Sequence, residues 1–135
     1  MTKDGTLLII DDTASIFAFF HAFLGEEYEI LFARHGEEGQ NIATNHQPDL
    51  ILLDVMMPEI NGFELCRRLK KNALTAHIPV MFISILDHED DMIKGLEAGA
   101  IDYLPKPFHL PSIKWKIKNH LAYRALLLDK AKQAP

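Results

Sequence analysis

The sequence predicts an α/β protein built on a parallel sheet. Apolar runs of strand length alternate along the chain with longer segments of helical period, and this alternation is typical of successive βαβ units. The strand-length runs barely alternate with polar residues, which indicates strands buried on both faces. The chain has 135 residues, of which 48% are hydrophobic and 24% charged. These are ordinary proportions for a single soluble domain with one core.

Five strands and five helices are expected in turn along the chain. The strand candidates are short apolar runs at residues 6–10, 28–33, 49–53, 79–84 and 101–104. The second and the last of these are the weaker candidates. The helix candidates are longer segments of helical period at residues 13–24, 37–45, 62–71, 87–98 and 109–130.

Composition argues against several classes of protein. The formal net charge is −5, and a broad nucleic-acid surface needs clustered Lys and Arg that this chain does not supply, so we expect no direct contact with nucleic acid. Cys66 is the single cysteine, which excludes an internal disulfide and favours a reducing cytoplasm. The start of the chain lacks a signal-peptide pattern, and no apolar run approaches the roughly 20 residues of a membrane span. We therefore expect no membrane association.

Five polar side chains fall at the carboxyl ends of the predicted strands. Asp11 and Asp12 follow the first strand, Asp54 follows the third, Ser84 ends the fourth and Lys106 follows the fifth. In an open parallel sheet, ligands bind in the crevice outside these strand ends. The sequence therefore predicts that all five groups share one edge of the sheet.

Three carboxylates in one crevice repel one another. At about 4 Å and an effective dielectric of 20, each pair costs about 4 kcal/mol. A hard divalent cation would offset this repulsion, and Mg²⁺ fits best because it takes few carboxylates, keeps several waters and pairs with phosphate. Lys106 would add a further positive charge. Without the metal, at least one carboxylate pKa should be raised, and protons should compete with the metal.

Each of these residues also has a simpler interpretation. The Asp11–Asp12 pair is a good helix cap, and for that pair alone the cap is the better interpretation. Asp54 alone could be a turn residue, Ser84 a hydroxyl at a strand end and Lys106 a solvated surface lysine. Their coincidence at the ends of different strands favours a site.

The motifs that carry these residues resemble those of the response-regulator receiver domains. They are Leu-Leu-Ile-Ile-Asp-Asp at residues 7–12, Pro-Asp-Leu-Ile-Leu-Leu-Asp-Val-Met-Met-Pro at residues 48–58, and the block at residues 95–108 that contains Tyr103 and Lys106. The resemblance extends over about residues 7–121. It implies a flavodoxin-like, doubly wound (βα)5 fold with strand order 2-1-3-4-5.

The resemblance also implies a role for each site residue. Asp54 would be the phosphoacceptor. Asp12, Asp54 and the backbone carbonyl of Met56 would hold Mg²⁺, with Asp11 acting mainly through water. A sensor histidine kinase or a histidine phosphotransfer protein would donate the phosphoryl group, and Mg²⁺ and Lys106 would neutralise charge on the transferring oxygens. The chain would catalyse only its own phosphorylation and dephosphorylation.

Switching is also implied by the resemblance. The Ser84 hydroxyl would bond the new phosphoryl oxygen, the Tyr103 ring would turn inward behind it, and the surface of the fourth helix, fifth strand and fifth helix would repack. Tyr103 could equally be a plain aromatic at the edge of the core. The family commonly has a cis peptide bond before the proline that matches Pro107.

Three features go beyond the family pattern. Ile85 follows Ser84 where a small residue is usual, and it either narrows access to the site or faces outward. Phe17 and Phe19 extend the apolar surface of the first helix as core residues or, less favoured, as a docking patch.

The third feature is the length of the last helix. We expect a receiver domain at residues 1–121 and a helical extension at residues 122–135, which either links to an output domain or pairs in a homodimer. A helix folded back on its own domain is the remaining alternative.

Two other functions remain open. The first is a pseudo-receiver, in which the same fold acts as a constitutive protein-interaction module. The second is a turnover enzyme, such as an aspartyl-phosphate phosphatase or a nucleotide-binding oxidoreductase. The sequence disfavours the second, because Met56 stands where such phosphatases place a second acid, and because the chain has no glycine-rich phosphate loop.

Overall fold

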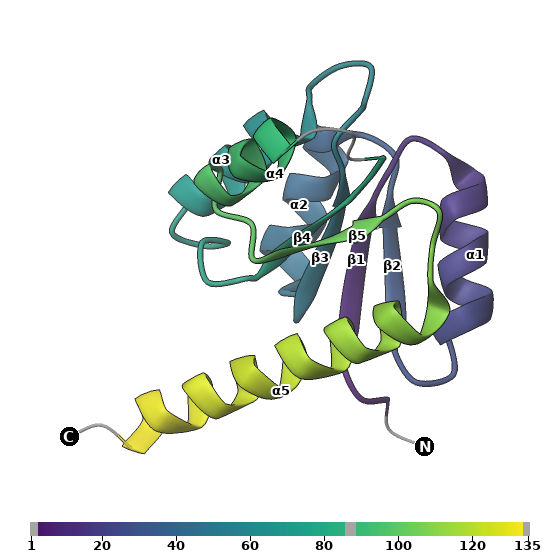
Figure 1. Cartoon of the computed structure of the whole chain (residues 1–135). Coiled ribbons are helices and arrows are strands. Elements are labelled where there is room, and N and C mark those ends of the chain that lie inside the picture. Colours follow the sequence, from purple (N-terminus) through teal and green to yellow (C-terminus); the bar gives the residue numbers. More distant parts are fainter. Residues whose placement is uncertain (1–2, 86–88, 134–135) are drawn as a thin grey trace.

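The computed structural model describes residues 3–85 and 89–133 and contains one parallel sheet within them (Figure 1). The strand order is β2-β1-β3-β4-β5, so the predicted doubly wound fold is confirmed. The strands are β1 (Thr6–Ile10), β2 (Glu29–Ala33), β3 (Leu50–Asp54), β4 (Val80–Ser84) and β5 (Asp102–Pro105). The helices are α1 (Ala14–Leu24), α2 (Gly36–His46), α3 (Gly62–Lys71), α4 (Glu89–Glu97) and α5 (Leu110–Gln133).

The predicted elements all occur, with shifts of a few residues at their ends. Asp49 and Pro79 were expected to begin strands and instead precede them, although both still bond to the neighbouring strand. The Asp49 N–H donates to the Thr6 carbonyl at 2.8 Å, and the Pro79 carbonyl accepts from the Ile51 N–H at 2.9 Å. The predicted start of the fourth helix, Asp87, lies outside the described residues.

The sheet separates two apolar clusters. On one face, buried residues of β1, β3 and β4 pack with Ala43 of α2, Leu65 of α3 and Ala98, which follows α4. On the other face, alternate strand residues pack with Phe20 of α1 and with Ile113 and Ile117 of α5. Because helices cover both faces, the three central strands are apolar on both sides, which explains why their sequences do not alternate.

The two phenylalanines considered as a docking patch on α1 are both half-buried. Phe19 packs against the cluster between α1, α5 and the sheet. Phe17 stacks on Phe32 of β2 with ring centroids 4.8 Å apart. Both rings therefore have partners within the domain, which favours the core interpretation over the docking patch.

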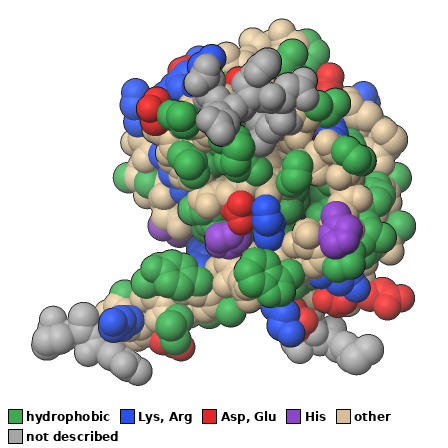
Figure 2. Space-filling model, in the orientation of Figure 1, with side chains coloured by type: hydrophobic (Ala, Val, Ile, Leu, Met, Phe, Trp, Pro, Cys, Tyr) green, Lys and Arg blue, Asp and Glu red, His purple; other side chains and the backbone are tan. Residues whose placement is uncertain are grey.

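Helix α5 continues past the body of the domain toward the C-terminus (Figure 1). Arg124 fastens its middle to the sheet, because its Nη1 donates to Asp49 Oδ1 at 2.7 Å and Asp49 Oδ2 accepts from the Thr6 N–H at 2.9 Å. Hydrophobic side chains gather along the helix in Figure 2, and Trp115, Tyr123 and Leu126 are exposed. In the part of the chain that the structure describes, no helix is both long enough and apolar enough to cross a membrane.

The register of the central strands brings the predicted site residues level with one another. Ile10 pairs with Leu53, so the next residues, Asp11 and Asp54, lie side by side at the carboxyl ends of β1 and β3. Asp54 in turn pairs with Ile83, and Ser84 pairs with Pro105. Residues that are far apart in the sequence therefore meet at one edge because three neighbouring parallel strands end together.

Candidate acidic site

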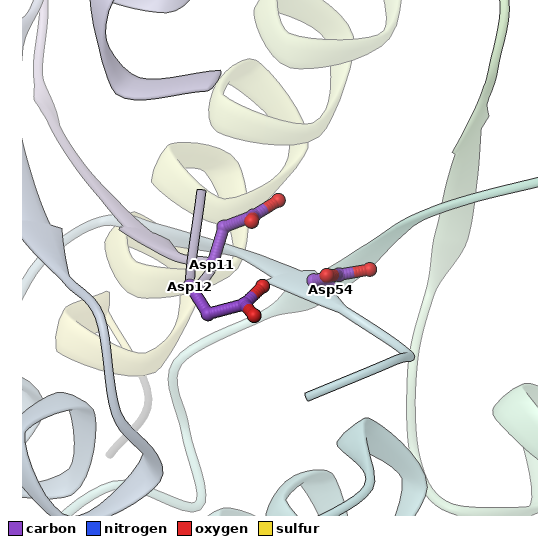
Figure 3. A group of neighbouring side chains, drawn as sticks. All are labelled: Asp11, Asp12 and Asp54. Carbon is purple, nitrogen blue, oxygen red and sulfur yellow. The ribbon is translucent and has the colours of Figure 1, made fainter. Parts of the chain in front are cut away.

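Three carboxylates converge at the carboxyl edge of the sheet (Figure 3). Asp11, Asp12 and Asp54 each offer an oxygen, and these oxygens lie within 4.8 Å of one another. Asp11 is fully buried and Asp54 is 7% exposed, whereas Asp12 is half-buried. The predicted acid cluster is therefore present and largely withdrawn from solvent.

The hydrogen bonds of Asp11 argue for a cation rather than a helix cap. Its Oδ1 accepts from the Thr13 N–H at 2.8 Å, and α1 begins after Thr13, which makes no side-chain cap bond. Its Oδ2 is buried and has no hydrogen-bond partner among the described residues. A buried carboxylate oxygen without a partner is costly, and a divalent cation is the ligand that would satisfy it. The residues present therefore fit Mg²⁺.

Burial and mutual repulsion raise the pKa values of two of these acids. The pKa of Asp54 rises from 3.8 to about 6, mainly because of desolvation and then because of the neighbouring Asp11. Desolvation also raises the pKa of Asp11. A raised carboxylate pKa was expected from like-charge repulsion, and the structure shows that burial is the larger cause.

Ser84 and Lys106 come from the ends of β4 and β5, which lie on the side of β3 opposite β1. Ser84 ends β4 and is 6% exposed, and its carbonyl accepts from the Lys106 N–H at 3.0 Å. The positive charge of Lys106 acts on both Asp11 and Asp54, offsetting part of the rise in their pKa values. The Lys106–Pro107 peptide bond is cis. The five polar groups predicted to share one edge therefore do so.

The loop after β3 passes close to the site. The Met56 N–H donates to Asp54 Oδ1 at 3.3 Å, and the Met56 side chain is 76% exposed. Gly62 closes this loop through its N–H bond to the Val55 carbonyl at 2.8 Å. A Cβ at Gly62 would lie 2.8 Å from Val55 Cα, so the close approach requires glycine. The role of the Met56 carbonyl as a metal ligand stays a prediction.

The Tyr103 ring lies inside the domain. Tyr103 is 5% exposed and stacks on Phe82 at a centroid distance of 6.1 Å, and its hydroxyl donates to the Met92 carbonyl of α4. A Cβ at Gly95 would meet the hydroxyl and lie 3.0 Å from the ring and from Phe82. Gly95 therefore makes room for the inward ring. The sequence signal for this role was a lone glycine inside a helical pattern, which often has a packing reason.

Ile85 follows Ser84 and is 65% exposed. This exposure favours the alternative in which its side chain faces outward. The alternative, in which Ile85 narrows access to the site, stays a prediction.

Comparison with known proteins identifies the family of the fold. The family model described as "Response regulator receiver domain" matches residues 7–118. The matched region contains every one of the predicted site residues.

Curated relatives carry this region as one part of longer proteins. Response regulator PleD of Caulobacter vibrioides is 38% identical over 94% of this chain and 28% of its own length. A probable cyclic di-GMP phosphodiesterase of Vibrio cholerae is 39% identical over 86% of this chain and 26% of its own. The phosphate regulon transcriptional regulatory protein PhoB of Pseudomonas aeruginosa is 43% identical over 76% of this chain and 45% of its own length. The chain spans less than half the length of each of these relatives.

Solved structures agree with this result. A CheY-like response regulator receiver domain protein from Methanospirillum hungatei is 27% identical, with a TM-score of 0.82 over 93% of this chain and 98% of that one. The receiver domain of a signal transduction histidine kinase from Syntrophus aciditrophicus is 34% identical, with a TM-score of 0.80 over 87% and 90%.

The raised pKa of Asp54 predicts a pH-dependent stability in the absence of divalent ions. A folded-state pKa above the unfolded value stabilises the fold at low pH, and this contribution is lost as the pH rises from about 4 through about 6. Asp54→Asn removes the buried charge that destabilises the fold at higher pH. We expect urea unfolding in EDTA at pH 7.5 to show the variant more stable by on the order of 1–3 kcal/mol, with a smaller difference at pH 4.5.

The exposed acid Asp129 provides the control, because Asp129→Asn should change stability little at either pH. Addition of Mg²⁺ should stabilise the wild type and leave Asp54→Asn nearly unchanged. Equal stability of the wild type and Asp54→Asn at pH 7.5 in EDTA would contradict the account of the buried acids.

Proposed function

Because the chain belongs to the response regulator receiver domain family, we propose that it is a phosphorylation switch of a two-component system with Asp54 as phosphoacceptor. Receiver domains are signalling switches that interact with histidine kinases and are often fused to output domains. The observation that carries the proposal for this chain is the convergence of Asp11, Asp12 and Asp54, with a buried oxygen on Asp11 that has no hydrogen-bond partner among the described residues.

Asp54 is suited to act as the nucleophile. In its ionised form, one carboxylate oxygen attacks the phosphorus of a phosphohistidine in line, the phosphorus–nitrogen bond breaks, and the electron pair leaves with the imidazole. A pKa of about 6 leaves Asp54 mostly ionised at neutral pH. Its Oδ1 is held by the Met56 N–H, and this bond orients the carboxylate.

The surrounding groups would stabilise the transferred charge. Asp11, Asp12, Asp54 and the Met56 carbonyl would hold Mg²⁺, which would neutralise negative charge on the phosphoryl oxygens when bound. Lys106 would approach these oxygens from the other side, and Ser84 would donate its hydroxyl to one of them. Hydrolysis of the acyl phosphate by water would return Asp54 to its free form and reset the switch.

The signal would leave the site through Tyr103. The ring lies inward in this structure, the orientation that the family resemblance assigns to the phosphorylated state. We propose that the ring also has an outward position, and that a bond between Ser84 and the phosphoryl group favours the inward one. The surface of α4, β5 and α5 would then differ between the two states.

The donor and the output are proposed at the level of class. The donor would be a sensor histidine kinase or a histidine phosphotransfer protein. Residues 1–121 would form the receiver unit, and residues 122–135 would continue α5 as a link to an output domain or as a dimer helix. The cytoplasmic location and the absence of contact with nucleic acid stay predictions from the sequence.

Phosphoryl acceptance can be tested directly. Incubation of the wild type with phosphoramidate and Mg²⁺ should add the mass of one phosphoryl group, as read by intact mass spectrometry. Asp54→Asn should gain none, because an amide is not nucleophilic enough to attack phosphorus. Asp129→Asn, an exposed acid on α5, should behave as the wild type.

The pseudo-receiver alternative makes the opposite prediction. A wild-type chain that gains no phosphoryl group from phosphoramidate or from a competent phosphohistidine donor would establish a constitutive interaction module. If Asp54→Asn still gains a phosphoryl group, the acceptor is another residue.

Gly95 allows a test of the switch. In the wild type, Gly95→Ala should destabilise the inward Tyr103 ring and lower the free energy of unfolding by about 1–3 kcal/mol, because the new Cβ overlaps the ring. In a Tyr103→Ala background the same change should be stabilising by up to about 1 kcal/mol, because alanine is the better helix former. Urea unfolding of the wild type, the two single variants and the double variant measures both values. A stabilising effect of Gly95→Ala in both backgrounds would refute the inward position of the Tyr103 ring.

A further inference from the structure

The backbone of Lys106 is held by contacts on both sides of it in the chain. Among the residues whose side chains the structure describes, 3–85 and 91–132, no carboxylate lies within 4.0 Å of its ammonium. The Lys106 N–H donates to the Ser84 carbonyl at 3.0 Å, which ties the residue to β4 on one side. What fixes the chain on the other side therefore decides where the ammonium lies relative to Asp54.

An aromatic cluster holds that other side. Phe108, two residues after Lys106, stacks on Phe19 of α1 with centroids 5.2 Å apart and an interplanar angle of 17°. It also meets Phe20 edge to face at 5.4 Å and 65°. Phe20 is fully buried, and Phe19 and Phe108 both pack against the cluster between α1, α5 and the sheet. Offset stacked and edge-to-face arrangements are the favourable geometries for aromatic pairs.

We propose that Phe19 is a positioning residue for the phosphoryl-transfer site, acting through Phe108 on the placement of Lys106. The proposal rests on the proposed function, in which Lys106 neutralises charge on the transferring oxygens. A flexible lysine serves that purpose only if its backbone is held, since small misplacements of a catalytic group cost large factors in rate. Phe20 fills the core beneath the pair, so Phe19 is the partner that can be changed with the least effect on packing.

The same helix supplies a matched control. Phe17 has the same side chain, is also half-buried, and stacks on Phe32 of β2 at 4.8 Å. It belongs to no aromatic pair with Phe108 among the described residues. Loss of Phe17 therefore removes comparable aromatic packing from α1 without touching the segment that follows Lys106.

Phosphorylation by phosphoramidate at saturating Mg²⁺ tests the proposal. Phe19→Ala should lower the maximal rate roughly 10- to 100-fold, whereas Phe17→Ala should leave it near the wild-type value. Phe19→Tyr keeps the ring and should restore the rate. Phe19→Ala should not lower the affinity for Mg²⁺, because the register of β1 and β3 places the three acids.

A double-mutant cycle separates positioning from general damage. In a Lys106→Met background, Phe19→Ala should slow phosphorylation no further, because the group through which it acts is gone. An additive loss, a weakened Mg²⁺ affinity or an unchanged rate in Phe19→Ala would each overturn the proposal. If Phe19→Ala fails to fold, Phe19→Leu takes its place with the same expected ordering.

A measurement that needs no phosphorylation keeps the two proposals distinguishable. The protein is labelled with ¹³C-lysine, and the NMR signals of the Lys106 side chain are assigned by their loss in Lys106→Arg. These signals should change chemical shift in Phe19→Ala and keep it in Phe17→Ala. Failure of the wild type to accept a phosphoryl group would refute the proposed function. An unmoved Lys106 signal in Phe19→Ala would refute the positioning role of Phe19 whether or not the wild type is phosphorylated.

Discussion

The repulsion between three carboxylates at the end of a parallel sheet is the constraint on which the rest of the site depends. The register of β1 and β3 forces Asp11 and Asp54 to emerge side by side, and burial prevents water from screening their charges. Desolvation and then this repulsion raise the pKa of Asp54 to about 6, and the fold tolerates the cost because apolar packing holds the central strands on both faces. A group that brings positive charge to the site would offset this electrostatic repulsion. A divalent cation and Lys106 are the groups that fit.

The sequence predicted the elements that depend on local pattern and on topology. The apolar runs around Leu8, Leu52 and Phe82 indicated buried parallel strands, and the acids after them could be placed at one edge because parallel strands end together. Contacts that depend on tertiary packing could not be predicted in this way. The space that Gly95 leaves for Tyr103 and the stacking of Phe19 on Phe108 join side chains from separate elements, and no spacing in the sequence encodes either contact.

Two contacts extend the site into the body of the domain in different directions. The ring of Tyr103 reaches α4, where the Met92 carbonyl and Gly95 receive it, and this contact lies on the surface expected to change on phosphorylation. The ring of Phe108 reaches α1 on the opposite face of the sheet. One side of the domain would therefore carry the signal while the other holds the catalytic lysine still. This division would allow a small domain to combine a rigid site with the proposed change at the surface of α4, β5 and α5.

We propose that the acid cluster at the ends of β1 and β3 binds a divalent cation. Titration with Mn²⁺, followed by the paramagnetic broadening of assigned backbone amide signals, tests whether a divalent cation binds at this cluster. We expect the amide signals of Asp12, Asp54 and Met56 to broaden first and excess Mg²⁺ to restore them. Broadening that begins at other acidic residues, such as Glu37 and Glu38 of α2, or that spreads evenly over the exposed acids, would contradict it.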